Sequence, residues 1–123
     1  MKSEIKISEA EYEIMMVIWE FSPISTNEVV DKLDGKNDWS PKTIQTLLSR
    51  LVKKGALAVT KRSREFVYTP QIKKSDYVSG ESENFLKKFY NGTLNSMVMN
   101  FLEEDKLTDD DIAELKRILD KRL

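Results

Sequence analysis

Two residue types with wide chemical use are missing from this chain of 123 residues, which contains neither cysteine nor histidine. Without cysteine it has no disulfide framework, no thiolate nucleophile and no zinc finger. Without histidine it has no Ser-His-Asp triad and no imidazole metal ligand. The usual centres of small-enzyme chemistry are therefore absent. We expect a protein that is not an enzyme and that holds no metal and no cofactor.

Long apolar stretches are missing as well. No run of about 18 apolar residues occurs, which is the least that a membrane-spanning helix needs. Residues 1–6 carry mixed charge and lack the apolar core of a signal peptide. Hydrophobic residues make up 40% and charged residues 33% of the chain, as in ordinary globular domains. We expect a soluble cytoplasmic protein without membrane insertion, folded as one domain or two very small ones.

Helix starts are the clearest local signal. At four places Ser or Thr follows an apolar residue, and a second apolar residue stands five positions after the first. This is the pattern of a hydroxyl N-cap with a hydrophobic staple. Ser8 and Ser25 are also followed, three residues later, by the Glu of a capping box. The signals predict helices over 9–21 and 26–33, a third that begins at Pro41 and stops at Gly55, and a last one that begins after Thr108.

After Gly55 the apolar pattern changes from helical to strand-like. Two β-prone runs, 56–60 and 65–69, flank the short polar segment 61–64, and this arrangement predicts a β-hairpin. Three helices followed by a hairpin make a winged helix-turn-helix.

From residue 76 the pattern returns to helix, over 76–90, 94–105 and from 108 onward. A bundle this small buries such wide apolar faces poorly unless it interlocks with a copy of itself. We therefore predict a mainly α fold with a small β-hairpin, in which 1–74 form a winged helix-turn-helix DNA-binding domain and 75–123 a three-helix dimerisation domain. The residues expected in the homodimer interface are Phe85, Phe89, Tyr90, Leu94, Met97, Val98, Phe101, Leu102, Ile112, Leu115, Ile118 and Leu119.

The formal net charge of −1 conceals three segments of different charge. Residues 1–39 sum to −5 and residues 75–123 to −4, whereas 40–74 hold nine Lys and Arg against Glu65 alone, a charge of +8. This basic segment contains the third helix and the hairpin, which are the two elements that a winged helix offers to DNA. Association with nucleic acid depends on such a local field more than on the total charge.

The polar side of the third helix carries residue types that read DNA. Gln and Arg can form paired hydrogen bonds with bases, Thr can contact a thymine methyl, and Lys suits phosphate. The alternatives are an ordinary solvated helix face and, for the hairpin turn, a solubilising loop. Lys53 and Lys54 also favour the helix dipole whether or not DNA is bound. The residues expected to bind DNA are Ser40, Lys42, Thr43, Gln45, Thr46, Ser49, Arg50 and Lys53 on the helix, and Lys61, Arg62 and Arg64 in the turn.

Two further groups of residues have simple structural explanations. The run Asp109–Asp111 could hold a divalent cation, but acids in a first helical turn complement the dipole and radiate rather than converge. Met15, Met16, Met97 and Met99 could form a soft-metal or peptide surface, but their spacing favours core packing.

Several short segments resemble one known family. Over essentially its whole length the chain is similar to the BlaI/MecI family of penicillinase repressors. The segments that carry the resemblance are Trp39-Ser40-Pro41-Lys42-Thr43-Ile44, Arg50-Leu51, Lys53-Lys54-Gly55, Phe89-Tyr90 and Asn95-Ser96-Met97-Val98-Met99-Asn100-Phe101.

The resemblance implies a homodimeric repressor of palindromic, double-stranded operator DNA upstream of β-lactamase or related resistance genes. It also implies induction through a membrane-bound β-lactam sensor-protease, followed by cleavage at an Asn-Phe bond, which here is Asn100–Phe101. Some members carry Arg where this chain has Gln45, which bears on base preference. The related copper-responsive repressors end in a cysteine-rich metal site, which this chain cannot form.

Other functions remain open from the sequence. A winged helix does not dictate its ligand, so its basic face could instead dock an acidic protein. A repressor of this fold could also control an unrelated operon. An enzyme comes third, because no glycine-rich nucleophile elbow or phosphate loop accompanies any Ser of the chain.

Overall fold

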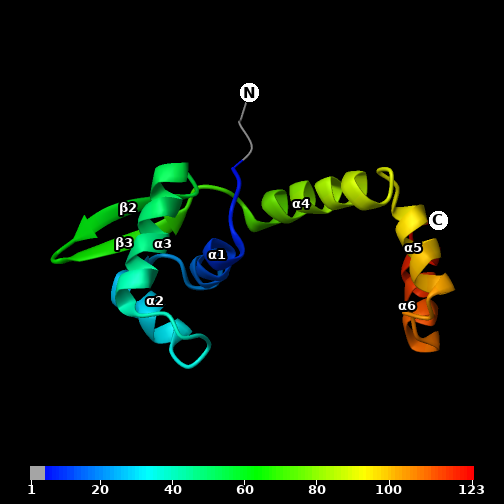
Figure 1. Ribbon diagram of the computed structural model, residues 1–123, viewed down its shortest axis with the longest axis horizontal. Helices are drawn as coiled ribbons and strands as arrows, with labels where there is room; N and C mark the ends of the chain where they lie inside the picture. The colour runs from blue at the N-terminus through cyan, green and yellow to red at the C-terminus, as the bar shows by residue number, and fades with distance from the viewer. Residues whose placement is uncertain (1–4) are drawn as a thin grey trace. The chain divides into compact units, whose positions relative to one another are not determined.

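The computed structural model describes residues 5–123, so the beginning of the mixed-charge segment 1–6 lies outside the described residues. The described part contains six helices and three strands, which confirms the predicted fold class (Figure 1). Two compact units are present, one ending at Tyr77 and the other spanning Val78–Leu123. The elements are α1 (Glu9–Phe21), β1 (Ile24–Ser25), α2 (Thr26–Leu33), α3 (Pro41–Lys54), β2 (Leu57–Arg62), β3 (Glu65–Pro70), α4 (Lys74–Phe89), α5 (Leu94–Glu103) and α6 (Asp109–Asp120).

Side-chain caps set the first three helices where the sequence predicts them. Ser8 Oγ accepts a hydrogen bond from the Glu11 backbone N–H, and the Glu11 carboxylate accepts one from the Ser8 N–H, which closes the capping box of α1. Ser25 forms the same box at the start of α2. Ser40 caps α3, and Gly55 ends it in the left-handed conformation, with φ of 86°. These contacts lie within a few residues of each helix end, so local sequence suffices to define the bounds.

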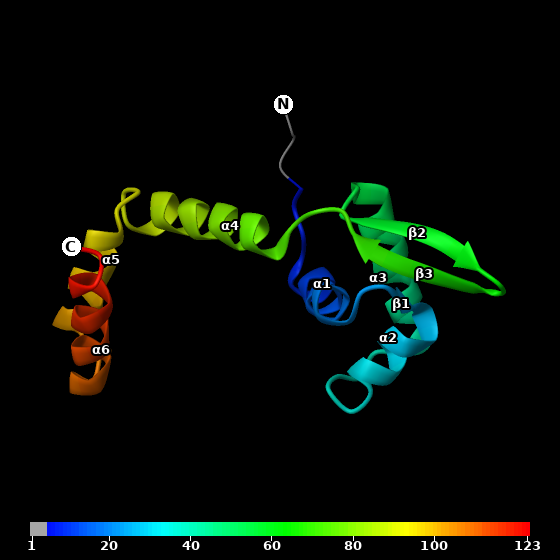
Figure 2. The ribbon, with the colours of Figure 1, turned by 180° about the vertical axis from the view of Figure 1, so that it is seen from behind.

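The sheet has the order β1-β3-β2 and is antiparallel throughout (Figure 2). The predicted hairpin is confirmed, but its strands extend further than expected. Lys61 and Arg62 belong to β2 rather than to the turn, and Ser63 and Arg64 alone connect the strands. Strand β1, which pairs Ile24 with Tyr68, was not predicted.

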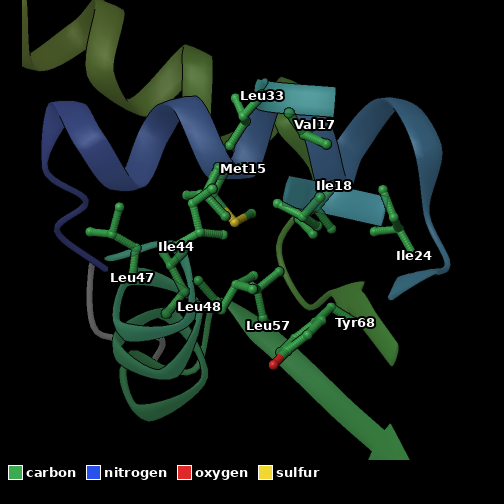
Figure 3. Packing of buried hydrophobic residues seen from close by; sticks show 14 residues of the cluster. Met15, Val17, Ile18, Ile24, Leu33, Ile44, Leu47, Leu48, Leu57 and Tyr68 are labelled. Carbon is green, nitrogen blue, oxygen red and sulfur yellow. The ribbon is translucent and has the colours of Figure 1, made fainter. Parts of the chain in front are cut away.

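The core of the first unit lies where α1, α2 and α3 meet the base of the sheet. In Figure 3, Met15 and Ile18 of α1 point toward Ile44 and Leu48 of α3, above Leu57 of β2. The buried apolar residues are Ile14, Met15, Val17, Ile18, Ile24, Val29, Leu33, Ile44, Leu47, Leu48, Leu51, Ala56, Leu57 and Tyr68.

One expectation for α1 was wrong. Met16 was assigned to the core, but it is 39% exposed, and Ile14 and Val17 are buried in its neighbourhood instead. Glu9, Glu13 and Glu20 recur at helical spacing on the side of α1 that faces solvent. Met16 falls on that same side, so its apolar character alone does not place it in the core.

An aromatic cluster connects α1 to the first turn of α4 within the first unit. The rings of Tyr12, Trp19 and Tyr77 lie 5.9–6.0 Å apart between centroids. The indole N–H of Trp19 donates a 3.0 Å hydrogen bond to the carbonyl of Ile72, just before α4 begins. The segment that leaves the sheet is therefore held against α1.

The second unit consists of most of α4 together with α5 and α6. Thr93 caps α5, and Thr108 with Asp111 forms a capping box at α6. Asp111 is thus used by the helix start, as expected for an acid in a first turn. None of residues 78–123 is buried. In the described part of the chain, no helix is long and apolar enough to cross a membrane.

Candidate nucleic-acid interface

The orientation of α3 follows from its buried stripe. Ile44, Leu47, Leu48 and Leu51 face the core, so the opposite side of the helix faces solvent. The exposed side forms a shallow hollow of about 410 Å³, and none of its lining residues is acidic. The lining residues are Lys42, Gln45, Thr46, Ser49, Arg50 and Lys53, all of which the sequence predicts to bind DNA.

We call this surface the α3 face. Its side chains are of two kinds, those suited to contact bases and those suited to contact phosphates. Gln45 and Arg50 can each make paired hydrogen bonds to a base edge, and Lys42 and Lys53 supply point charges for phosphate. The hydroxyl of Thr46 donates a 3.1 Å hydrogen bond to the carbonyl of Lys42. That bond leaves the Thr46 methyl group available for apolar contact.

Ser40 and Thr43 lie at the start of α3 and do not line the hollow. Ser40 Oγ accepts the Thr43 N–H at 3.2 Å, and the two hydroxyl oxygens lie 3.1 Å apart. Ser40 therefore caps α3 in the free protein, and Thr43 is the residue that it caps. Their contact with DNA stays a prediction.

The three basic residues of the hairpin tip are exposed but do not form one group. In the register, Lys61 pairs with Phe66 and Arg62 pairs with Glu65. Neighbouring residues of a strand point to opposite faces, so Lys61 and Arg62 lie on different faces of the hairpin. Arg64 stands in the connecting turn.

One cation of the basic segment already has a partner. Lys54 Nζ lies 2.5 Å from the buried Oε1 of Glu11 and 2.9 Å from the carbonyl of Lys6. Burial raises the pKa of Glu11, but the hydrogen bonds that it accepts from Lys54 and Ser8 lower it by more, so the pKa lies below the ordinary value of 4.5. The sequence did not reveal this pair, because its residues are 43 positions apart.

The candidate cleavage bond, Asn100–Phe101, lies inside α5, and both residues are half-buried. The hydroxyl of Tyr90 donates a 3.3 Å hydrogen bond to Oδ1 of Asn100. Tyr90 and Asn100 also line a hollow of about 530 Å³, together with Phe85 and Phe89. The sequence did not predict the contact between Tyr90 and Asn100.

The capped helix α3 with its basic polar side, packed on two helices and followed by a hairpin, defines a winged-helix protein of the nucleic-acid-binding type. Comparison with known proteins identifies the family. The model of the family described as penicillinase repressor matches residues 7–121. The chain belongs to this family, as its sequence indicates, and the family consists of DNA-binding transcriptional repressors, not enzymes.

Individual relatives are similar over nearly the whole chain. A penicillinase repressor of Bacillus licheniformis is 57% identical over 121 residues, which cover 98% of this chain and 94% of that protein. The methicillin resistance regulatory protein MecI of Staphylococcus aureus is 42% identical and covers 95% of both chains. Among solved structures, the chain is similar to the solution structure of monomeric Bacillus licheniformis BlaI in complex with the blaP half-operator, with a TM-score of 0.54. The sequence identity is 58%, and the match covers 63% of this chain and 94% of that one.

Proposed function

We propose that the protein is a dimeric transcriptional repressor of a β-lactamase or related antibiotic-resistance operon, bound to a palindromic operator. The observation that carries the proposal is the α3 face, a solvent-exposed helix side lined only by cationic and hydrogen-bonding side chains. Over 63% of its length the chain is 58% identical to a monomeric form of BlaI whose structure includes a half-operator. A regulator that acts on operator DNA works in the cytoplasm.

In this proposal α3 enters the major groove. Arg50 and Gln45 read base edges there, while Lys42 and Lys53 contact phosphates on either side. Lys61, Arg62 and Arg64 of the hairpin contact the flanking backbone. Lys54 has no part in the interface, because its ammonium group is bound to Glu11.

The second unit is proposed to form the homodimer. In the single chain none of its apolar residues is buried, and some are largely exposed: Phe89 is 58% exposed and Leu119 is 62% exposed. Burying apolar area yields about 25 cal/mol per Å², so a second copy that covers these faces stabilises both chains. A two-fold dimer presents two α3 faces to the two halves of a palindrome. The proposed interface includes Phe85, Phe89, Tyr90, Leu94, Met97, Val98, Phe101, Leu102, Ile112, Leu115, Ile118 and Leu119.

Relief of repression is proposed to follow cleavage of Asn100–Phe101 in response to a membrane-bound β-lactam sensor-protease. The bond divides α5, so the cut separates α6 and the end of α5 from the rest of the chain. Five of the proposed interface residues follow Phe101. Their loss weakens the dimer, and a monomer binds a single half-site without the added effect of the second.

The test is selection of bound duplexes from a random pool, followed by titration at several salt concentrations. We expect a palindrome with half-sites one helical turn or a multiple of it apart, and an affinity that falls steeply with salt because phosphate contacts release counterions. Enrichment of no sequence would contradict the proposal. Indifference to competing duplex DNA would favour a protein-docking module instead.

A further inference from the structure

The hairpin carries an apolar surface that the basic residues do not explain. Pairing places Leu57, Val59 and Lys61 of β2 on the same face as Phe66 and Tyr68 of β3. At the base of the hairpin this face is buried in the core. Toward the tip it emerges, with Val59 38% exposed and Phe66 53% exposed.

This face and α3 enclose a second hollow, of about 400 Å³. Gln45, Ser49 and Val52 line it from the helix, and Val59, Phe66 and Tyr68 line it from the sheet. We call it the wing hollow. Gln45 and Ser49 also line the α3 face, so the two hollows share a wall and form one continuous surface.

The charge around the wing hollow favours a polyanion. Lys61 stands across the ladder from Phe66, with its Nζ 6.0 Å from the ring centroid. Among the described residues that line this hollow, none is acidic. Glu65, the one acid of the basic segment, pairs with Arg62 and points to the other face of the hairpin.

We propose that the wing hollow receives the carbon-rich part of a DNA strand at the edge of the groove that α3 occupies, with Phe66 and Val59 as its contacts. This inference rests on the proposed operator binding and adds an apolar term to it. A DNA strand presents apolar C–H groups on its deoxyriboses, and thymine adds a methyl group in the major groove. Lys61, beside Phe66, then meets the adjoining phosphate.

An apolar contact and a phosphate contact differ in how they respond to salt. Loss of a phosphate contact lowers the number of released counterions, whereas loss of an apolar contact leaves that number unchanged. The slope of log affinity against log salt concentration therefore separates Phe66 from the neighbouring cations.

The experiment uses the full chain and a palindromic duplex that the wild type selects from a random pool. For Phe66→Ala we expect an affinity about tenfold lower at every salt concentration, as for an apolar side chain that loses part of its burial. For Arg64→Ala we expect a slope smaller by about 0.9, as for one phosphate contact. Val59→Thr, which keeps the shape and strand propensity of valine, is expected to lower affinity about threefold without a change of slope.

Phe21→Ala is the matched control. Phe21 is 41% exposed in the same unit, lies under Lys32 at 4.1 Å and lines neither hollow. We expect it to bind the duplex as the wild type does. Replacing operator thymines by uracil separates the two sources of apolar contact: if Phe66 touches a thymine methyl, the replacement removes the effect of Phe66→Ala, and if it touches deoxyribose, the effect persists.

Wild-type affinity of both Phe66→Ala and Val59→Thr would overturn the inference while leaving operator binding intact. A changed salt slope for Phe66→Ala would also overturn it. A wild-type chain that selects no duplex would contradict the proposed function itself, so the two failures are distinguishable.

Discussion

The ammonium group of Lys54, at the end of α3, lies 2.5 Å from the Oε1 atom of Glu11, in the first turn of α1. Glu11 is only 2% exposed, and the same carboxylate oxygen accepts the N–H of Ser8 in the capping box. One side chain therefore completes the start of α1 and holds the C-terminal end of the helix proposed to read DNA.

Mutation of the adjacent lysines should affect different properties: Lys54 contributes to stability, and Lys53 contributes to DNA binding. Lys54→Met leaves the buried Glu11 carboxylate without its cation, and we expect the free energy of unfolding to fall by about 1–2 kcal/mol, a value reduced for the partial exposure of Lys54. Lys53→Met should leave stability within about 0.5 kcal/mol and instead lower the salt slope of DNA binding by about 1. Urea unfolding and salt-dependent titration of both variants check this, and equal stability of the two variants would contradict it.

The same pair predicts how stability depends on pH. The pKa of Glu11 is below 4.5 in the folded chain, because hydrogen bonds from Lys54 and Ser8 outweigh the effect of burial. A group with a lowered folded-state pKa stabilises fully above its unfolded pKa, and this contribution is lost as the pH falls through the folded value. We expect the midpoint of urea unfolding to decrease below about pH 4.5, and to decrease less in Glu11→Gln. Parallel curves for the two proteins would exclude this role of Glu11.

The sequence predicts the parts of this fold that depend on neighbours in the chain. Ser8, Ser25 and Ser40 act on backbone groups within three residues, so the bounds of α1, α2 and α3 follow from local patterns. The α3 face was also predictable, because a stripe of buried residues at helical spacing determines which side chains stand opposite.

What the sequence did not predict depends on distant pairing. Strand β1 is two residues long, which is too short to show the alternation of apolar and polar residues that marks a strand. It forms because β3 lies beside it. Lys61 and Arg62 have the polar character of a turn, but the ladder with Phe66 and Glu65 extends the strands through them. The wing hollow likewise forms only where α3 and the hairpin meet. The sequence of the hairpin indicated its basic residues but not the apolar surface next to them.

Base preference should change at Gln45. Glutamine can pair with the N6 and N7 atoms of adenine, whereas arginine pairs with O6 and N7 of guanine. For Gln45→Arg we expect the selected duplexes to exchange adenine for guanine at one position of each half-site, with a discrimination of about 1–3 kcal/mol. Lys42→Arg, which stays a phosphate contact, is the matched control and should select the wild-type sequence. An unchanged preference in Gln45→Arg would remove Gln45 from base recognition.

The hydrogen bond from Tyr90 to Asn100 should control how readily α5 opens. A protease needs the Asn100–Phe101 segment unwound, and cleavage follows the population of the open form when opening and closing are fast. Tyr90→Phe removes a hydrogen bond worth about 0.5–1.5 kcal/mol, so we expect amide exchange in α5 to accelerate by roughly 2- to 12-fold. Limited proteolysis at the Asn100–Phe101 segment should accelerate by the same factor. Tyr68→Phe removes a hydroxyl from the first unit and should leave both rates unchanged. The two variants are compared at protein concentrations that give the same fraction of dimer. Equal rates of amide exchange in α5 would show that the Tyr90 hydroxyl does not restrain the candidate cleavage bond.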